Sequence, residues 1–258
     1  MLGIGVGEYV NLVPFGIEGA CIQRLKEAVE CIKLLWTATP ENPTNYNGEF
    51  YQFKDAFLTV EPRQKPHPPI YIGALGPRTR ELVGELADGW YPWISAPELY
   101  QEDLKDVERG VKRAGRSLDE IDAAVSFYTA VSDDYDEARS AIEWISKRAL
   151  VLERRTLKRL GHGVHIPKNL SIQRSLSSKE VASAVRDLAR TVPMKAVEAI
   201  SGFGTVEDCI NKIEEFLKVG ARHLIVHNVG PNIDETLRRY GEEIMPYFKE
   251  EQKLRVQS

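Results

Sequence analysis

The sequence predicts an α/β protein built on a parallel sheet. Apolar segments of strand length alternate with segments of helical periodicity. We count five strand–helix units, and parallel strands need such crossover helices. Five units fit an open doubly wound sheet or part of an eight-stranded barrel. Of the 258 residues, 43% are hydrophobic, which is enough for one sizeable core. We therefore expect a single domain over 1–258 that contains a helical insertion at 134–191.

The elements of the first half follow from local patterns. Residues 2–7, LGIGVG, predict a short buried strand in which glycine alternates with apolar residues. Apolar residues at helical spacing predict a helix over 18–37. The Asn-Gly pair at 47–48, between aromatic-rich segments, predicts a small hairpin. PIYIGA at 69–74 predicts a buried strand, and Pro77 begins a helix because the first helical position needs no backbone N–H.

The second half continues the alternation around the insertion. Thr205 and Asp208 form a capping-box pattern at the start of a helix, which Gly220 ends. The insertion contains two or three helices around a polar loop. The remaining predicted elements are a strand at 88–93, a helix at 97–115, a strand at 121–132, a helix at 204–221, a strand at 223–228 and a helix at 232–250.

Composition excludes several classes of function. The net charge of −4 and the pI near 5.8 argue against nucleic acid or an anionic membrane as a partner. The three cysteines form no CxxC pair, which is typical of a reduced protein. No apolar run approaches the ~18 residues of a membrane span, and the first residues lack a signal-peptide pattern. We expect a cytoplasmic protein without a metal site, because His162 and His165 have no third ligand nearby.

The clearest chemistry lies in the turn Ala74-Leu75-Gly76-Pro77-Arg78-Thr79. A strand here runs into the start of a helix, where free N–H groups and the helix dipole favour an anion such as a phosphate. Arg78 adds a charge and Thr79 adds a hydroxyl. A simple strand–helix turn that begins with a proline fits the same residues, so the local sequence leaves both interpretations open.

The opening MLGIGVGEYVN matches neither a phosphate loop nor a dinucleotide fingerprint, because no Gly-Lys-Ser/Thr follows and the third glycine comes one residue early. Alternating glycines leave one face of a strand bare, and a flat ring fits such a face. Glu8, at the end of the strand, is suited to accept or relay a proton, although an exposed loop carboxylate fits as well. For His227, at another strand end, we favour core hydrogen bonds over catalysis.

Four segments together resemble the bacterial-luciferase-like family of flavin- and coenzyme F420-dependent oxidoreductases. They are LGIGVGEYVN, RLKEAVECIKLLWT followed by YNGEFYQF, PPIYIGALGPRTRELVGELADGWYP, and GTVEDCINKIEEFLKVGARHLIVHNVGP. Within the family, the Gly-x-Gly-Glu-x-x-Asn arrangement and the Ala-x-Gly-Pro turn resemble the F420-dependent branch that includes methylenetetrahydromethanopterin reductase. The resemblance implies a (β/α)8 TIM barrel of the luciferase-like type that is incomplete here, with strands four to eight present.

The resemblance also implies a cofactor, coenzyme F420 or alternatively FMN, at the carboxyl ends of the strands. By this resemblance Glu8 is the catalytic residue near the reacting carbon. Val6, Gly7 and Asn11 line the ring and its ribityl chain. The resemblance also implies that Ala74, Leu75, Gly76, Pro77, Arg78 and Thr79 bind the cofactor, with Leu75, Gly76, Arg78 and Thr79 at its phosphate. The implied partners are a small-molecule substrate and a second copy of the chain in a homodimer.

Two departures from the family shape these expectations. The segment WYPWISAP lacks the threonine and lysine that the family's sugar-phosphate dehydrogenases carry there, which argues against a phosphorylated sugar as substrate. Relatives also have three further strand–helix units before LGIGVGE, so we expect that the natural polypeptide or its evolutionary source included them. Hydride transfer from or to coenzyme F420 is our first interpretation. An FMN-dependent monooxygenase and a shortened, non-catalytic cofactor-binding or scaffold protein are the alternatives.

Overall fold

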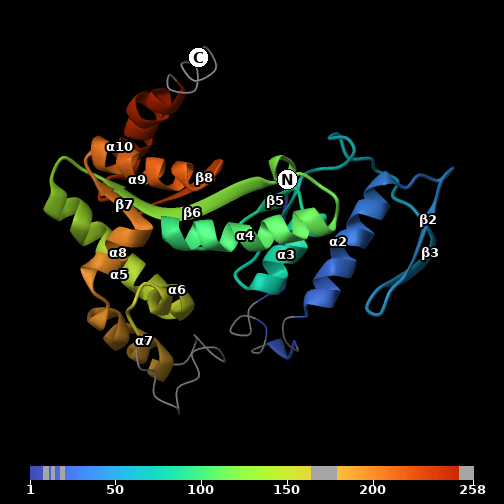
Figure 1. The fold of residues 1–258 in the computed structure, drawn as a ribbon, viewed down its shortest axis with the longest axis horizontal. Coiled ribbons are helices and arrows are strands. Elements are labelled where there is room, and N and C mark those ends of the chain that lie inside the picture. The colour runs from blue at the N-terminus through green and yellow to red at the C-terminus, as the bar shows by residue number, and fades with distance from the viewer. Residues whose placement is uncertain (8–11, 13–14, 18–20, 164–178, 250–258) are drawn as a thin grey trace. The chain divides into compact units, whose positions relative to one another are not determined.

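The structure is a computed structural model whose path is drawn in Figure 1. It describes residues 1–7, 12, 15–17, 21–163 and 179–249. The chain divides into two compact units. Unit 1 contains residues 1–93 and 102–124, and unit 2 contains residues 94–101 and the described residues from 125 onward.

Unit 1 is organised by a parallel sheet. Strand β1 (Leu2–Gly5) pairs with β4 (Ile70–Gly73), which pairs with β5 (Gly89–Trp90), and β5 pairs with the start of β6 (Asp122–Val131). Helix α3 (Pro77–Leu86) connects β4 to β5, as a parallel connection requires. Ile70, Ile72 and Trp90 are fully buried and belong to the core of this unit.

Helix α4 (Pro97–Arg113) approaches α3 closely in unit 1. A Cβ atom on Gly84 would lie 2.1 Å from the carbonyl oxygen of Val107, and one on Gly110 would lie 1.9 Å from that of Glu81. Both distances are far below van der Waals contact, so only glycine fits at either position. The close contact between the two backbones brings acidic residues of α4 to α3.

A hairpin and helix α2 (Ile22–Thr37) complete unit 1. Strands β2 (Thr44–Asn47) and β3 (Gln52–Ala56) pair antiparallel, and Figure 1 shows them as a ribbon beside α2. The carboxylate of Glu27 on α2 is buried and accepts hydrogen bonds from three consecutive backbone N–H groups of the hairpin loop. One buried side chain therefore fixes the loop to the helix.

Unit 2 contains the rest of the sheet and the remaining helices. The second part of β6 pairs parallel with β7 (Ser201–Gly204) and also pairs with β8 (His223–Asn228). Its core gathers Phe127, Val131, Cys209, Ile213 and Ile244. The helical elements are α5 (Tyr135–Leu152), α6 (Arg154–Arg159), α7 (Lys179–Thr191), α8 (Met194–Ile200), α9 (Val206–Lys218), α10 (Ile233–Arg239) and the π-helical turn η3 (Tyr240–Ile244).

Several predicted elements of unit 1 are present with shorter bounds. Strand β1 covers Leu2–Gly5 of the predicted 2–7, and β4 covers Ile70–Gly73 of the predicted 69–74. Helix α2 begins at Ile22 rather than at residue 18, and residues 18–20 lie outside the described part of the chain. Strand β5 covers only Gly89–Trp90 of the predicted 88–93. Helix α4 ends at Arg113. The hairpin is confirmed, although Asn47 ends a strand and Gly48 begins a four-residue loop.

Unit 2 contains one strand that the sequence did not predict. Strand β7 is four residues long and includes two glycines, so no apolar run marks it. All four residues are buried, and they pair with Tyr128–Val131 of β6. The capping box of α9 is confirmed, because Thr205 and Asp208 exchange both expected hydrogen bonds. No helix in the described residues combines the length and hydropathy that a membrane crossing needs.

Candidate cofactor site

A strip of bare backbone lies at the carboxyl end of the paired strands β1 and β4. Gly5 stands directly opposite Gly73, and both residues are exposed. A Cβ atom on either glycine would have no neighbour closer than 3.6 Å. Because residues paired across a sheet point to the same face, this face carries no side chain at the two positions. The strip is therefore a flat and open surface, as the alternating glycines predicted.

Towards the amino end the same face is closed by Tyr71. Tyr71 and Gly73 are two residues apart on β4, so their side chains share a face. The Tyr71 ring lies across Gly89, and its hydroxyl donates a hydrogen bond to the carboxylate of Asp122. Burial and this hydrogen bond raise the pKa of Tyr71. A protonated tyrosine thus fills one end of the face, whereas the end nearer the strand carboxyl termini stays open.

Two buried side chains hold consecutive carbonyl groups of the turn between β4 and α3. The indole Nε1 of Trp90 donates to the carbonyl oxygen of Ala74 at 3.1 Å. The guanidinium of Arg80 donates to the carbonyl oxygen of Leu75. In a trans peptide the N–H points opposite to the preceding carbonyl group. The N–H groups of Leu75 and Gly76 therefore point away from Trp90 and Arg80.

The same turn offers several unused donors. Within the part of the chain that the structure describes, the backbone N–H groups of Leu75, Gly76, Arg78 and Thr79 make no hydrogen bond. Pro77 occupies the first turn of α3, no side chain caps the helix, and its first turn contains no acidic residue. These donors and the positive end of the helix dipole favour an anion.

The two side chains predicted for this turn differ in their surroundings. Arg78 is exposed, so its charge is available to a ligand. Thr79 is only 7% exposed, and its hydroxyl has no partner among the described residues. Among the described residues, every fully buried polar side-chain atom has a hydrogen-bond partner. Because the Thr79 hydroxyl has no partner, it is not fully buried and keeps access to solvent. Neither side chain is therefore held by another described residue.

Two of the other predicted site residues are described at the end of β1. Val6 is half-buried and Gly7 is exposed. Gly7 has φ +77°, a conformation that favours glycine. Because β1 pairs with β4, these residues lie at the same sheet edge as the turn. Glu8 and Asn11 lie outside the described residues, so their roles stay predictions.

His227 on β8 in unit 2 is engaged by its neighbours. Its Nε2 lies 2.5 Å from the hydroxyl oxygen of buried Ser126, and its ring centroid is 5.4 Å from that of Tyr128. Burial lowers the pKa of His227, so the neutral imidazole is favoured. This arrangement agrees with the core hydrogen bonding that the sequence favoured.

Polar side chains at the other strand ends of unit 2 are also occupied. Thr129 accepts a hydrogen bond from Tyr240 at 2.9 Å. Asn228 accepts from the backbone N–H of Gly230 and donates to the carbonyl oxygen of Ile233. The start of α9 is closed by its capping box and carries acidic residues in its first turn. These positions do not offer the unused donors found at the start of α3.

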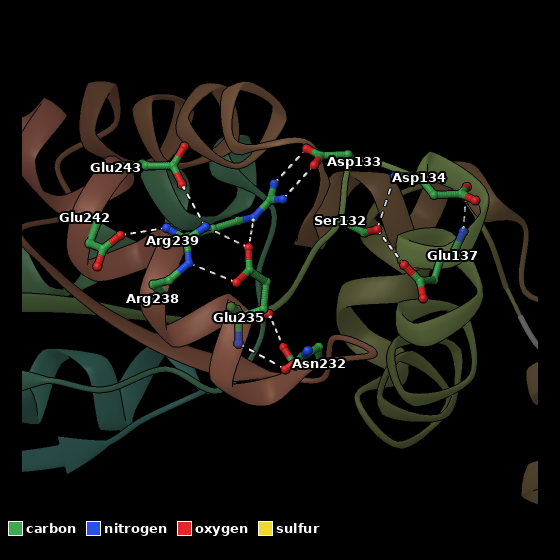
Figure 2. A network of polar contacts seen from close by, with 11 residues as sticks. Ser132, Asp133, Asp134, Glu137, Asn232, Glu235, Arg238, Arg239, Glu242 and Glu243 are labelled. Atoms are coloured by element: carbon green, nitrogen blue, oxygen red, sulfur yellow. Dashed lines mark hydrogen bonds and ion pairs between the residues drawn. The ribbon is translucent and has the colours of Figure 1, made fainter.

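Figure 2 shows an ion-pair network that joins α10 to the segment after β6. The guanidinium of Arg239 donates to both carboxylate oxygens of Asp133, at 2.7 and 2.6 Å. Glu235 accepts from Arg238 and Arg239, and these hydrogen bonds lower the pKa of Glu235 to about 2. The arginines are neutralised by carboxylates, which indicates a structural network rather than an anion site. The described residues contain no group of three or more potential metal ligands.

Sequence patterns did not identify Arg80 and Trp90, which hold the two turn carbonyls. Neither belongs to a motif. Arg80 looks like an ordinary polar residue of a helix, and Trp90 looks like a core residue. Their roles depend on partners 5 and 16 residues away along the chain. The one local signal for this site is the strand–turn–helix pattern. The pattern identifies the turn, but it does not identify the side chains that hold the turn's carbonyl groups.

Comparisons with known proteins identify relatives of this chain. The sequence profile of the family of luciferase-like monooxygenases matches residues 1–223. An F420-dependent glucose-6-phosphate dehydrogenase of Microbacterium testaceum is 32% identical over 96% of this chain and 68% of its own length. A 5,10-methylenetetrahydromethanopterin reductase of Archaeoglobus fulgidus is 29% identical over 96% of this chain and 74% of its own length.

A solved structure shows the same fold. The coenzyme F420 dependent tetrahydromethanopterin reductase from Methanopyrus kandleri matches with a TM-score of 0.79 at 25% identity. The match covers 96% of this chain and 74% of that one. The expected fold class, a luciferase-like α/β barrel represented in part, is confirmed.

Proposed function

The chain belongs to the luciferase-like monooxygenase family, and from this premise we propose that it is an oxidoreductase that uses coenzyme F420. The reaction is hydride transfer between the cofactor and a small carbon substrate. The relative at 32% identity favours coenzyme F420 over FMN, because it is called F420-dependent. The M. kandleri reductase, which depends on coenzyme F420, supports the same choice.

The observation that carries the proposal is the juxtaposition of a bare surface and an anion-binding turn. The strip formed by Gly5 and Gly73 accepts a flat ring without steric conflict. The turn from Leu75 to Thr79 lies one residue after β4 and offers four backbone N–H donors that make no hydrogen bond within the described residues. A cofactor with a flat ring joined to a phosphate matches this order. The residues present therefore fit coenzyme F420.

When bound, the deazaflavin supplies the hydride chemistry. The chain would orient the ring on the strip, hold the phosphate at the start of α3 and exclude water. Val6 and Gly7 would contact the ring and its ribityl chain, and Arg78 would balance the charge of the phosphate. We assign to Glu8 the proton transfer at the reacting centre, as the family resemblance implies.

For the substrate we propose a one-carbon unit on a reduced pterin, as in the methylenetetrahydromethanopterin reductases. The supporting observation is the segment WYPWISAP, which contains no lysine to pair with a sugar phosphate. Glucose 6-phosphate is the competing candidate, because one relative at 32% identity is a glucose-6-phosphate dehydrogenase. We further propose that the protein acts as a cytoplasmic homodimer.

The cofactor is tested by fluorescence titration of the purified protein with coenzyme F420 and with FMN. We expect saturable binding of coenzyme F420 and much weaker binding of FMN. Tight binding of FMN with none of F420 would support the monooxygenase alternative instead. Binding of neither cofactor would support the non-catalytic alternative and contradict the proposal.

The substrate is tested by following the absorbance of reduced and oxidised F420 with each candidate. We expect turnover with methylenetetrahydromethanopterin and none with glucose 6-phosphate. Turnover with the sugar phosphate alone would overturn the substrate assignment but not the cofactor. Light scattering checks the homodimer, and a monomer at every concentration tested would contradict it.

A further inference from the structure

Arg80 on α3 is a buried cation whose partners come from two directions. It is 7% exposed. Its Nε donates to Asp106 at 2.8 Å, and its Nη2 lies 3.0 Å from Asp103 and 2.6 Å from Asp106. Its Nη1 donates to the carbonyl oxygen of Leu75, in the turn that we assign to the cofactor phosphate.

We propose that Arg80 is a positioning residue, which sets the affinity of this turn for the cofactor phosphate without touching the phosphate. This inference rests on the proposed function. The side chain is held on the buried side of the turn by Asp103 and Asp106, so it is directed away from the unused N–H groups. Its effect on the ligand passes through the peptide between Leu75 and Gly76.

The orientation of that peptide decides whether the turn attracts or repels an anion. With the Leu75 carbonyl oxygen held by Arg80, the N–H of Gly76 points to the opposite side and adds a donor to the site. If the peptide rotated by half a turn, the carbonyl oxygen would replace the N–H and face the phosphate. The exchange would remove a favourable dipole and introduce an unfavourable one. Holding the carbonyl in place therefore preorganises the donors.

Arginine suits this role better than lysine. A planar guanidinium donates along several fixed directions, so it serves two carboxylates and a carbonyl group at once. A lysine ammonium at this depth would pair with Asp103 and Asp106 and would not reach Leu75 as well. The carboxylates themselves are available only because Gly84 and Gly110 let the backbones of α3 and α4 meet.

Trp90 provides an independent test of the idea that a held carbonyl group directs the next N–H toward the phosphate. Its indole N–H holds the preceding carbonyl, that of Ala74, at 3.1 Å. The N–H that this contact directs outward belongs to Leu75. If peptide orientation controls phosphate affinity, then removing either support should weaken phosphate binding in the same way.

The experiment compares two ligands that share a ring. One is coenzyme F420, and the other is its phosphate-free deazaflavin ribityl fragment. Their dissociation constants are measured by fluorescence titration for the wild type and for Arg80→Lys, Arg80→Gln and Trp90→Phe. For each variant we expect about tenfold weaker binding of F420 and unchanged binding of the fragment, because one directed donor is lost while the ring surface is intact.

Arg116→Gln is the matched control. Arg116 also donates to backbone carbonyl groups, those of Gly84 in α3 and of Ala87 just after it, at 3.1 and 2.9 Å, but at the far end of the helix. This variant should lower thermal stability without changing the ratio of the two dissociation constants. Arg80→Lys keeps a cation beside the two aspartates, so it remains informative if Arg80→Gln does not fold.

The outcomes separate this inference from the proposed function. A wild type that binds F420 more tightly than the fragment, with the ratio unchanged in Arg80→Lys and Trp90→Phe, would overturn the positioning role alone. Equal weakening of both ligands would overturn it too, because that result indicates general distortion of the site. A wild type that binds neither ligand would overturn the proposed function as well.

Discussion

The ring of Tyr71 lies across Gly89, so that a Cβ atom at position 89 would stand 2.3 Å from it. The two residues are paired neighbours on β4 and β5, and the next residue in the same row is Asp122 of β6. The absence of a side chain at Gly89 is what allows the Tyr71 hydroxyl to reach Asp122. One glycine thus permits a hydrogen bond that spans three strands.

This relationship predicts that Gly89→Ala is strongly destabilising. The added methyl group must displace the tyrosine ring from a packed core, and overpacking of this kind costs about 1–3 kcal/mol. Urea denaturation measures the change in the free energy of unfolding. Gly3→Ala is the control, because a Cβ atom there has no neighbour within 4 Å. Equal stability of the two variants would contradict the packing described here.

Gly73→Val should strongly weaken cofactor binding without harming the fold. A Cβ atom at position 73 meets only two carbonyl oxygens at 3.8 Å, and valine is a good strand former. The branched side chain would nevertheless stand on the strip where the ring is proposed to lie. We expect F420 affinity to fall by about a hundredfold or more, which corresponds to ~3 kcal/mol. Gly3→Val, on the neighbouring strand β1 and two residues before Gly5, should bind normally. Unchanged binding by Gly73→Val would show that the ring does not lie on the strip.

Arg78→Ala should weaken cofactor binding by about 1–3 kcal/mol, through the loss of one charge-assisted hydrogen bond. The side chain is exposed, so thermal stability should not change. The loss should shrink at high salt, because screening already weakens the interaction in the wild type. Arg63→Ala removes another exposed cation of unit 1 and serves as the control. If the two variants bind F420 equally well, Arg78 does not contact the phosphate.

Glu27→Gln should release the loop of the β2–β3 hairpin. Glu27 is 2% exposed and accepts from the N–H groups of Glu49, Phe50 and Tyr51 at 3.0, 2.8 and 3.2 Å. Burial alone would raise the pKa of Glu27, but the hydrogen bonds outweigh it and lower the pKa. An amide offers one acceptor oxygen and points an N–H₂ group at the remaining donors.

Hydrogen exchange checks this prediction at the level of single amides. We expect the three loop N–H groups to exchange about tenfold faster or more in Glu27→Gln, because the local opening becomes easier. Amides of β4 report on unit 1 as a whole and should keep their protection. Uniformly faster exchange at both places would indicate global destabilisation instead.

The network of Figure 2 predicts a pH dependence of stability. The pKa of Glu235 is lowered to about 2 from 4.5. A lowered folded-state pKa stabilises the protein above the unfolded value, and this contribution disappears as the pH falls from about 4.5 to about 2. Glu235→Gln should therefore unfold at a lower temperature than the wild type near pH 7, and the difference should vanish as the pH approaches 2.

Thermal unfolding across this pH range measures the effect. Glu198→Gln is the matched control, since Glu198 is exposed and makes no ion pair among the described residues. Its difference from the wild type should be small at every pH. A constant difference for Glu235→Gln between pH 7 and pH 2 would show that the carboxylate charge does not stabilise the network.

Local sequence patterns were sufficient for most elements of the fold. The Pro77 helix start, the hairpin at Asn47-Gly48 and the capping box of Thr205 and Asp208 all involve residues within a few positions of one another. Strand β7 was not predicted from the sequence, because two of its four residues are glycines and its partner strand β6 lies more than 70 positions earlier. Pairing between strands so far apart in the chain produces no local hydrophobic periodicity in the sequence.

The sequence by itself determined the alternation of strands and helices, the bare glycines of β1 and the strand–turn–helix pattern at Ala74–Thr79. Each of these depends on backbone conformations that neighbouring residues impose. Tertiary structure alone decided that Gly5 faces Gly73, that Trp90 and Arg80 hold the turn carbonyls, and that Asp103 and Asp106 neutralise Arg80. The physical reason is distance along the chain: a buried hydrogen bond or ion pair is set by which helices and strands pack together, and no residue near Arg80 in the sequence specifies its partner 26 positions away.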